Sequence, residues 1–273
     1  MAKKLGVKIE DLISLYNEGK NLAEIAEIMH LKSIGSISNR LKKAGIVIKR
    51  DYSKTRRRRA NCYQINEEYF ETINTEGKAY FLGLMMADGC INSNGIQFYL
   101  KMKDEDVIQK FKKELECEHP IRYTNYKNHS MYILEVSSKK SCEFLKKYGC
   151  VSNKDYIVQL PNIEESLIRH FIRGYFDGDG CLQLQHKIYR CRFDIVSASK
   201  LILEQFRSII SKHSITNGYL GKETYSNSWH LNFSGHQVEI ILDWLYKDAN
   251  FYLKRKYDKY LILKTMVSRT KIG

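Results

Sequence analysis

The sequence predicts an α+β protein with a two-fold pseudo-symmetric core, preceded by a small all-α unit. Three observations lead to this fold class. The segment Phe81–Gly89 recurs 91 residues later as Ile172–Gly180, and each copy ends in Asp-Gly. Helical and hairpin patterns follow both copies in the same order, which is typical of α+β domains with antiparallel sheets. Residues 9–46, by contrast, show only helical periodicity.

The bulk composition is that of a soluble globular protein. The chain has 273 residues, of which 43% are hydrophobic, enough for a sizeable core. No apolar run is long enough to span a bilayer, and no apolar segment follows the first lysines as a secretory signal would require. The seven cysteines form no C-x-x-C pair, which argues against a zinc site or a disulfide framework. We therefore expect an intracellular protein, in the cytoplasm or nucleoid, or in the organelle or virus-infected cell that holds its DNA.

The positive charge is concentrated near the N-terminus. The chain has a net charge of +14, and residues 1–60 hold 15 lysines or arginines against 6 acidic residues. A basic arm of this kind indicates a polyanionic partner, most commonly nucleic acid. The alternative is a solvated charged face that keeps the protein soluble.

Residues 1–48 predict a helix-turn-helix domain. The expected helices are Glu10–Asn17, Leu22–Met29 and Ile34–Ala44, with Gly19 and Gly45 as stops. The third helix is polar and basic on its outer face, where Asn39 and Arg40 suit base edges and Lys43 suits phosphate. A generic three-helix cap would show the same pattern.

Residues 49–65 predict a basic linker. The run Arg56, Arg57, Arg58 and Arg59 repels itself and should be extended in isolation. Its expected partner is the phosphate backbone or the minor groove. A localisation signal is the competing interpretation.

The rest of the chain divides into two halves, residues 66–160 and 161–273, each with an αββαββα order. In the first half we expect helices at Glu76–Ala87, Glu105–Leu115 and Ser141–Tyr148, and strands near Cys90–Asn92, Ile96–Lys103, Ile121–Asn125 and Met131–Ser137. In the second half we expect helices at Glu164–Gly178, Lys200–His213, Gln237–Tyr246 and Lys254–Lys264, a hairpin over Cys181–Ala198, and strands near Tyr219–Thr224 and Ser228–Phe233.

Several strands alternate apolar and polar residues, as half-buried strands do. An ordinary solvent face would explain the polar positions. However, they are rich in Gln, Lys, Arg and Tyr with few acids, which suits a β-ribbon that reads base edges in a major groove. The candidate DNA-contacting residues are Gln97, Tyr99, Lys101, Lys103, Gln183, Gln185, Lys187, Arg190, Arg192, His230 and Asn232.

The repeated segments carry the candidate chemistry. Small residues recur four apart in each predicted helix, at Gly83 and Ala87 and at Gly174 and Gly178, and such spacing lets two helix backbones approach closely. Gly89 and Gly180 are the expected C-terminal caps.

If the two helices pack together, Asp88 and Asp179 converge at their negative ends. A divalent cation such as Mg²⁺ would offset the repulsion between the two carboxylates and could activate water at a scissile phosphate. A lone Asp-Gly is usually only a turn, but two matched copies favour the metal site.

These two motifs resemble those of the LAGLIDADG homing endonucleases in their single-chain, two-motif form, over about residues 66–265. The resemblance implies two pseudo-symmetric halves with the motif helices at the interface and antiparallel, saddle-shaped sheets over the DNA. It implies that Asp88 and Asp179 bind Mg²⁺ or Mn²⁺, assisted by the backbone carbonyls of Ala87 and Gly178. The implied reaction hydrolyses both strands of a long, specific DNA site and leaves 3′ overhangs.

The family also places a basic residue near the active site after the last helix of each half. Lys154 and Lys256 occupy the matching segments and are candidates to position water or stabilise charge on the phosphate. An ordinary surface lysine is the alternative for each. One departure between the copies is Met86, which stands where the second motif has Asp177, and it suggests an asymmetric recognition site.

We therefore expect a monomeric, metal-dependent, site-specific DNA endonuclease of the kind that mediates intron homing. A non-catalytic DNA-binding regulator and an RNA-splicing maturase with intron RNA as its partner are the alternatives on the same scaffold. An intein is disfavoured because no flanking splicing segments are recognised.

Overall fold

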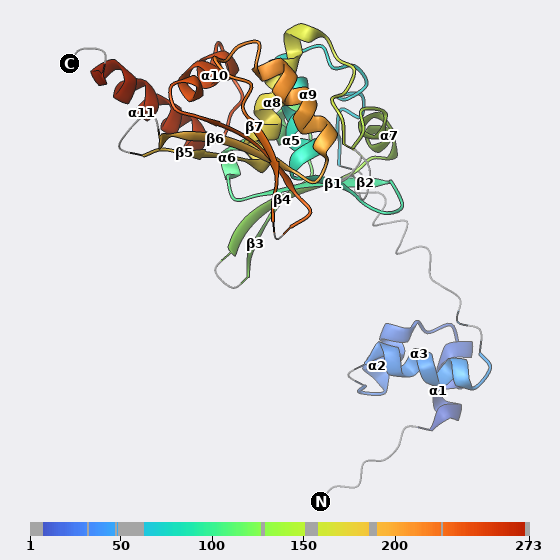
Figure 1. Cartoon of the computed structure of the whole chain (residues 1–273). Helices are drawn as coiled ribbons and strands as arrows, with labels where there is room; N and C mark the ends of the chain where they lie inside the picture. The colour runs from blue at the N-terminus through green and yellow to red at the C-terminus, as the bar shows by residue number, and fades with distance from the viewer. Residues whose placement is uncertain are drawn as a thin grey trace, which may run out of the picture. The chain divides into compact units, whose positions relative to one another are not determined.

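The computed structural model describes residues 8–31, 33–46, 48, 63–126, 129–150, 158–185, 190–224 and 226–270 (Figure 1). The chain divides into two compact units, residues 1–62 and residues 63–273. Among the described residues, none of the helices combines the length and apolar character needed to cross a membrane.

The first unit is a three-helix cluster. Its helices are α1 (Ile9–Asn17), α2 (Leu22–Ile28) and α3 (Ile34–Lys43), each within one residue of its predicted ends. Leu12, Ile25, Ala26, Ile37 and Leu41 form its buried core. Asn21 caps α2 with a capping box. Gly19 and Gly45 adopt left-handed backbone with φ of 86° and 81°, as stop signals at helix ends require.

The second unit contains two rounds of the same element order. The first half has helices α5 (Glu76–Ala87), α6 (Glu105–Glu114) and α7 (Lys139–Lys147), and strands β1 (Gly89–Ile91), β2 (Gln97–Met102), β3 (Ile121–Tyr126) and β4 (His129–Ser137). The second half has helices α8 (Glu165–Asp179), α9 (Lys200–Ile210) and α10 (Gln237–Tyr246), and strands β5 (Gly180–Gln183), β6 (Arg192–Ser197), β7 (Tyr219–Lys222) and β8 (Trp229–Ser234).

Each half forms a four-stranded antiparallel sheet, in the orders β1-β2-β4-β3 and β5-β6-β8-β7. The registers correspond as well, because Gly89 pairs with Leu100 in the first sheet and Gly180 with Ile195 in the second. In each sheet the second hairpin therefore joins the first through its later strand. The predicted α+β class and the doubled αββαββα order are confirmed.

The helices pack on one face of the sheets, and that face holds the core. In β2, Phe98, Leu100 and Met102 are buried and the intervening Tyr99 and Lys101 are exposed. One continuous apolar cluster runs through both halves. In Figure 1, α5 and α8 lie side by side.

The final helix, α11 (Lys254–Thr270), extends six residues beyond its predicted end. Leu263 and Val267, four residues apart, are both buried. This apolar face continues past the predicted end and keeps the segment helical through its packing.

Candidate active site and DNA interface

Helices α5 and α8 cross at their small residues with matched geometry. A Cβ placed on Gly83 would lie 2.1 Å from the carbonyl oxygen of Phe171, and one placed on Gly174 would lie 1.9 Å from that of Tyr80. Tyr80 and Phe171 are themselves 91 residues apart, as the two glycines are. The crossing is therefore pseudo-symmetric, and at these two positions only glycine leaves room for the partner backbone.

The same contact continues to the helix ends. A Cβ on Gly178 would lie 2.4 Å from the Ala87 Cβ and 3.2 Å from Oδ2 of Asp88. The carboxylate of Asp88 thus lies against Gly178 in the last turn of α8, one residue before Asp179. Asp88 is exposed and Asp179 is half-buried, so both acids can be reached from solvent.

A hollow of about 270 Å³ adjoins this pair of helix ends. Met86 and Ala87 line it from α5, Asp179 lines it from α8, and Ser197 and Ala198 lie at the end of β6. The space beside the second acid is therefore bounded by both halves of the unit.

The donor chemistry at the helix ends fits a hard divalent cation. The described residues contain no group of three or more His, Cys, Asp or Glu side chains arranged to hold a metal ion. Two carboxylates and nearby backbone carbonyls are an incomplete shell, and Mg²⁺ is the cation that keeps several waters and takes substrate phosphate oxygens for the rest. Asp88 and Asp179, with the carbonyls of Ala87 and Gly178, would hold such an ion.

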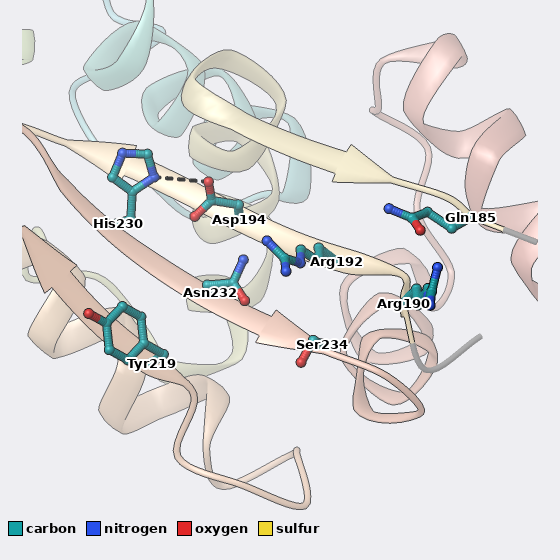
Figure 2. Close-up of a pocket in the computed structure, with 8 residues that line it drawn as sticks. All are labelled: Gln185, Arg190, Arg192, Asp194, Tyr219, His230, Asn232 and Ser234. Carbon is teal, nitrogen blue, oxygen red and sulfur yellow. Dashed lines mark hydrogen bonds and ion pairs between the residues drawn. The ribbon is translucent and has the colours of Figure 1, made fainter. Parts of the chain in front are cut away.

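The outer face of the second sheet is polar and hollowed. Figure 2 shows the side chains that line this hollow, which has a volume of about 690 Å³: Gln185, Arg190, Arg192, Asp194, Tyr219, His230, Asn232 and Ser234. Five of the predicted DNA-contacting residues are therefore brought together on one surface. Gln183 is exposed near the end of β5.

Residues 166–238 match the family model described as LAGLIDADG-like domain. This part of the chain is similar to a LAGLIDADG-like domain. Among solved structures, the meganuclease I-SmaMI bound to uncleaveable DNA is similar, with a TM-score of 0.50, 12% identity and coverage of 74% of this chain and 92% of that chain. At that identity the likeness concerns the fold, and it agrees with the two αββαββα halves seen here.

Two curated relatives are similar to more than half of this chain. A probable translation initiation factor IF-2 of Methanocaldococcus jannaschii is 26% identical over 68% of this chain and 17% of its own length. The DNA-directed RNA polymerase subunit Rpo1C of the same organism is 24% identical over 63% of this chain and 21% of its own length. The chain thus spans about a fifth of the length of these relatives.

The glycines that end the two motifs lie at the ends of their helices, as predicted, and each also begins a strand. Gly180 has extended backbone with φ of −104° and begins β5, and Gly89 likewise begins β1 without left-handed backbone. Crowding explains the residue type, because a Cβ on Gly89 would lie 2.6 Å from the Met85 carbonyl oxygen and one on Gly180 2.4 Å from that of Phe176. Gly180 is the C-cap of α8 and Gly89 follows the C-cap Asp88 of α5, and neither adopts the left-handed backbone common at helix C-termini.

Lys256 is buried beneath the second LAGLIDADG helix, with 2% of its surface exposed. Its Nζ donates to the carbonyl oxygens of Phe176, of Asp177 at 3.0 Å and of Gly180 at 2.7 Å. Burial lowers the pKa of Lys256 to about 8, while the Asp177 carboxylate opposes this shift. The ammonium group thus offsets the negative end of α8 from inside the protein. Lys154 lies outside the described residues.

Asp177 stands at the motif position that Met86 occupies in the first half, and no further role was predicted for it. Its side chain is fully buried. Its Oδ2 accepts hydrogen bonds from Tyr80 Oη at 2.9 Å and from the Leu253 amide at 2.8 Å. Burial raises the pKa of Asp177, although Lys256 and these hydrogen bonds act in the other direction. This side chain therefore ties both motif helices to the start of α11.

A salt bridge between a buried arginine and a half-buried glutamate lies one turn earlier in α8. Arg173 is fully buried, and its Nη2 lies 2.6 Å from Oε1 of Glu76 on α5. Burial raises the pKa of Glu76, but hydrogen bonds from Asn250 and the charge of Arg173 more than offset this, so the pKa is lowered overall. No sequence signal indicated the pair, because its partners lie 97 residues apart.

His230 is placed on the predicted face, but both of its ring nitrogens are occupied. Nδ1 lies 3.0 Å from Asp194 Oδ2, and Nε2 lies 2.8 Å from Glu223 Oε2. The face therefore holds more acid than predicted, and His230 lies between the two carboxylates. Reading a base with this imidazole would require breaking one of these contacts.

The first sheet presents a different outer face. Tyr99, Lys101 and Lys103 are exposed as predicted. The amide group of Gln97 donates to Ser137 Oγ at 2.9 Å and accepts from Asn92 Nδ2 at 3.0 Å. It therefore links the start of β2 to the end of β4 and to the residue after β1.

In the small unit, Asn39 and Lys43 are exposed on α3 and Arg40 is half-buried. This arrangement leaves Asn39 and Lys43 available to a partner. Three sets of predicted contacts lie outside the described residues: the arginine run at 56–59, Lys187 and the rest of the linker that precedes Tyr63.

Proposed function

We propose that this chain is a site-specific double-strand DNA endonuclease that depends on a divalent metal ion. The observation that supports the proposal is the approach of the Asp88 carboxylate to Gly178, the residue before Asp179, at two helix ends that solvent can reach. The LAGLIDADG-like domain and the fold shared with a DNA-bound meganuclease support a nuclease of this kind.

Asp88 and Asp179 would hold Mg²⁺ or Mn²⁺, together with the carbonyls of Ala87 and Gly178. The bound ion would supply an activated water and stabilise the leaving oxygen. Lys256 supports this site by fixing the end of α8, and Lys154 is proposed to stand nearer the phosphate in the first half. Because one chain carries both motif helices, a monomer is sufficient to cut both strands, with 3′ overhangs as the expected product.

The partner we propose is a long double-stranded DNA site, as in intron homing. The outer faces of the two sheets would read base edges. Asn39, Arg40 and Lys43 on α3, and the arginine run at 56–59, would extend the contact along the backbone. The activities named for the two curated relatives are not proposed for this chain, because it matches only about a fifth of each and their named functions differ from one another.

The test is selection of cleaved sites from a randomised duplex library with Mg²⁺, followed by cleavage of the selected site by variants. Asp88→Asn and Asp179→Asn should each abolish double-strand cleavage but leave binding within about threefold, because the overall fold and the sheet faces are unchanged. Loss of a metal ligand typically costs several orders of magnitude in rate.

Asp106→Asn is the matched control, since Asp106 is an exposed aspartate on α6 and its variant should cut normally. A motif variant that still cuts at the wild-type rate would refute the metal assignment. Wild-type binding without any cut product would favour the DNA-binding regulator. Preference for intron RNA over duplex DNA in a filter-binding comparison would favour the maturase.

A further inference from the structure

The two sheets can be compared position by position through their strand registers. Cys90 pairs with Tyr99 in the first sheet, and Cys181 pairs with Asp194 in the second. Tyr99 in turn pairs with Glu135, and Asp194 with Asn232. Tyr99 thus corresponds to Asp194.

The strand registers give two further pairs of equivalent positions in the two sheets. Ile133 corresponds to His230, and Gln97 corresponds to Arg192. The outer faces of the two halves therefore differ in chemistry at equivalent positions.

The second sheet presents hydrogen-bonding groups to its hollow. Arg192 is exposed and forms no ion pair within the part of the chain that the structure describes, because His230 already engages the nearby Asp194. A guanidinium group of this kind can donate two bonds to the O6 and N7 atoms of guanine, and an amide such as Asn232 can pair with adenine. This face is suited to purine edges.

The first sheet presents apolar groups at its centre. Ile133 and Met131 are half-buried on its outer face, and Tyr99 is 36% exposed beside them. The arginine of this face, Arg122, is tied to Glu135. Lys101 remains as the exposed charge on β2. Apolar side chains in a major groove contact the C5-methyl group of thymine.

We propose that the two sheets read half-sites of different base chemistry. The second sheet reads guanine through Arg192, with adenine at Asn232, and the first reads thymine methyl groups through Ile133 and Met131. This inference rests on the proposed DNA-binding function and adds to it which base groups each half recognises.

The test modifies the DNA rather than the protein, so folding is not at issue. In the selected site, thymines of one half-site at a time are replaced by deoxyuridine, which lacks only the methyl group. Guanines are replaced separately by 7-deazaguanine, which lacks the N7 acceptor. Deoxyuridine should weaken binding roughly fivefold or more in the first half-site and less in the second, and 7-deazaguanine should have the larger effect in the second.

A pair of arginine variants gives a second measurement. Arg192→Gln should relax the preference for guanine at one position of the second half-site, whereas Arg122→Gln should leave the selected sequence unchanged because Arg122 is held by Glu135. Circular dichroism melts would confirm that both variants fold.

Equal sensitivity of both half-sites to either analogue would overturn the inference, and so would a shift in selected sequence for Arg122→Gln alone. These outcomes leave the endonuclease proposal standing, since the site is still bound and cut. A wild-type protein that binds no duplex would instead refute the proposed function together with this inference.

Discussion

The most unusual single residue in the motif helices is His170, which is buried beside a buried arginine. Its Nδ1 lies 2.9 Å from Arg173 Nη1, so the ring accepts a hydrogen bond from the guanidinium and is neutral. Burial lowers the pKa of His170 to about 4, and the charges of Arg173 and Arg169 act in the same direction.

This shift predicts acid sensitivity of the second unit. An unfolded histidine binds a proton near pH 6.5, whereas the folded one does so only near pH 4. The unfolded state therefore gains protons first as pH falls. The contribution of His170 to stability is complete above pH 6.5 and is lost progressively down to pH 4, by on the order of 3 kcal/mol.

Denaturant unfolding between pH 7 and pH 4 measures this dependence. His170→Gln should flatten the decline, while His236→Gln, at an exposed histidine, should leave it as in the wild type. An unchanged slope in the His170 variant would mean that other groups cause the acid sensitivity.

At the scale of elements, the crossing of α5 and α8 requires glycine, which has no side chain, at two positions. Gly83→Ala or Gly174→Ala would place a methyl group about 2 Å from a backbone carbonyl oxygen of the other helix. Because neither backbone can yield without shifting a helix, each change should destabilise the unit by about 3 kcal/mol or more and lower its melting temperature.

Gly35→Ala on α3 is the control, since the added methyl group would meet only Ser33 Oγ at 3.7 Å. Alanine favours helix there, so the control should be neutral or slightly stabilising. Calorimetry on the three variants makes the comparison. A small effect at both Gly83 and Gly174 would contradict the close crossing.

The elements also show what the sequence could predict. The ends of α5 and α10 and the pleat of β2 were predicted correctly, because caps and periodicity are local signals. The close crossing of α5 and α8 was predicted from the small residues repeated four apart. The role of Lys256 was not predictable, because its carbonyl partners lie 76 to 80 residues away and an isolated lysine in a sequence is most simply interpreted as a surface residue.

The whole molecule consists of two units with separate cores. Because residues 1–60 carry 15 basic side chains, the small unit and its linker should supply much of the binding to phosphate. A chain that begins at Tyr63 should still cut the selected site but bind it more weakly. The logarithm of its affinity should also fall less steeply with the logarithm of salt, by about 0.9 for each phosphate that the shortened chain no longer neutralises.

Fluorescence anisotropy over a salt series, with footprinting of both chains, measures these changes. The full-length chain in which Lys3 and Lys4 are replaced by glutamine is the control, since it removes charge without removing the helices. An unchanged footprint and salt slope after the deletion would show that the small unit serves a purpose other than DNA binding.

The buried network between α5 and α8 also limits which halves of the second unit can pair with each other. Arg173 and Asp177 of the second half bond to Glu76 and Tyr80 of the first half. In the second half, the positions that align with Glu76 and Tyr80 are occupied by Leu167 and Phe171. Two second halves brought together would enclose four ionic side chains without these partners, at a cost of several kcal/mol. If the halves were made as separate polypeptides, their assembly would therefore favour the mixed dimer over self-association of the second half.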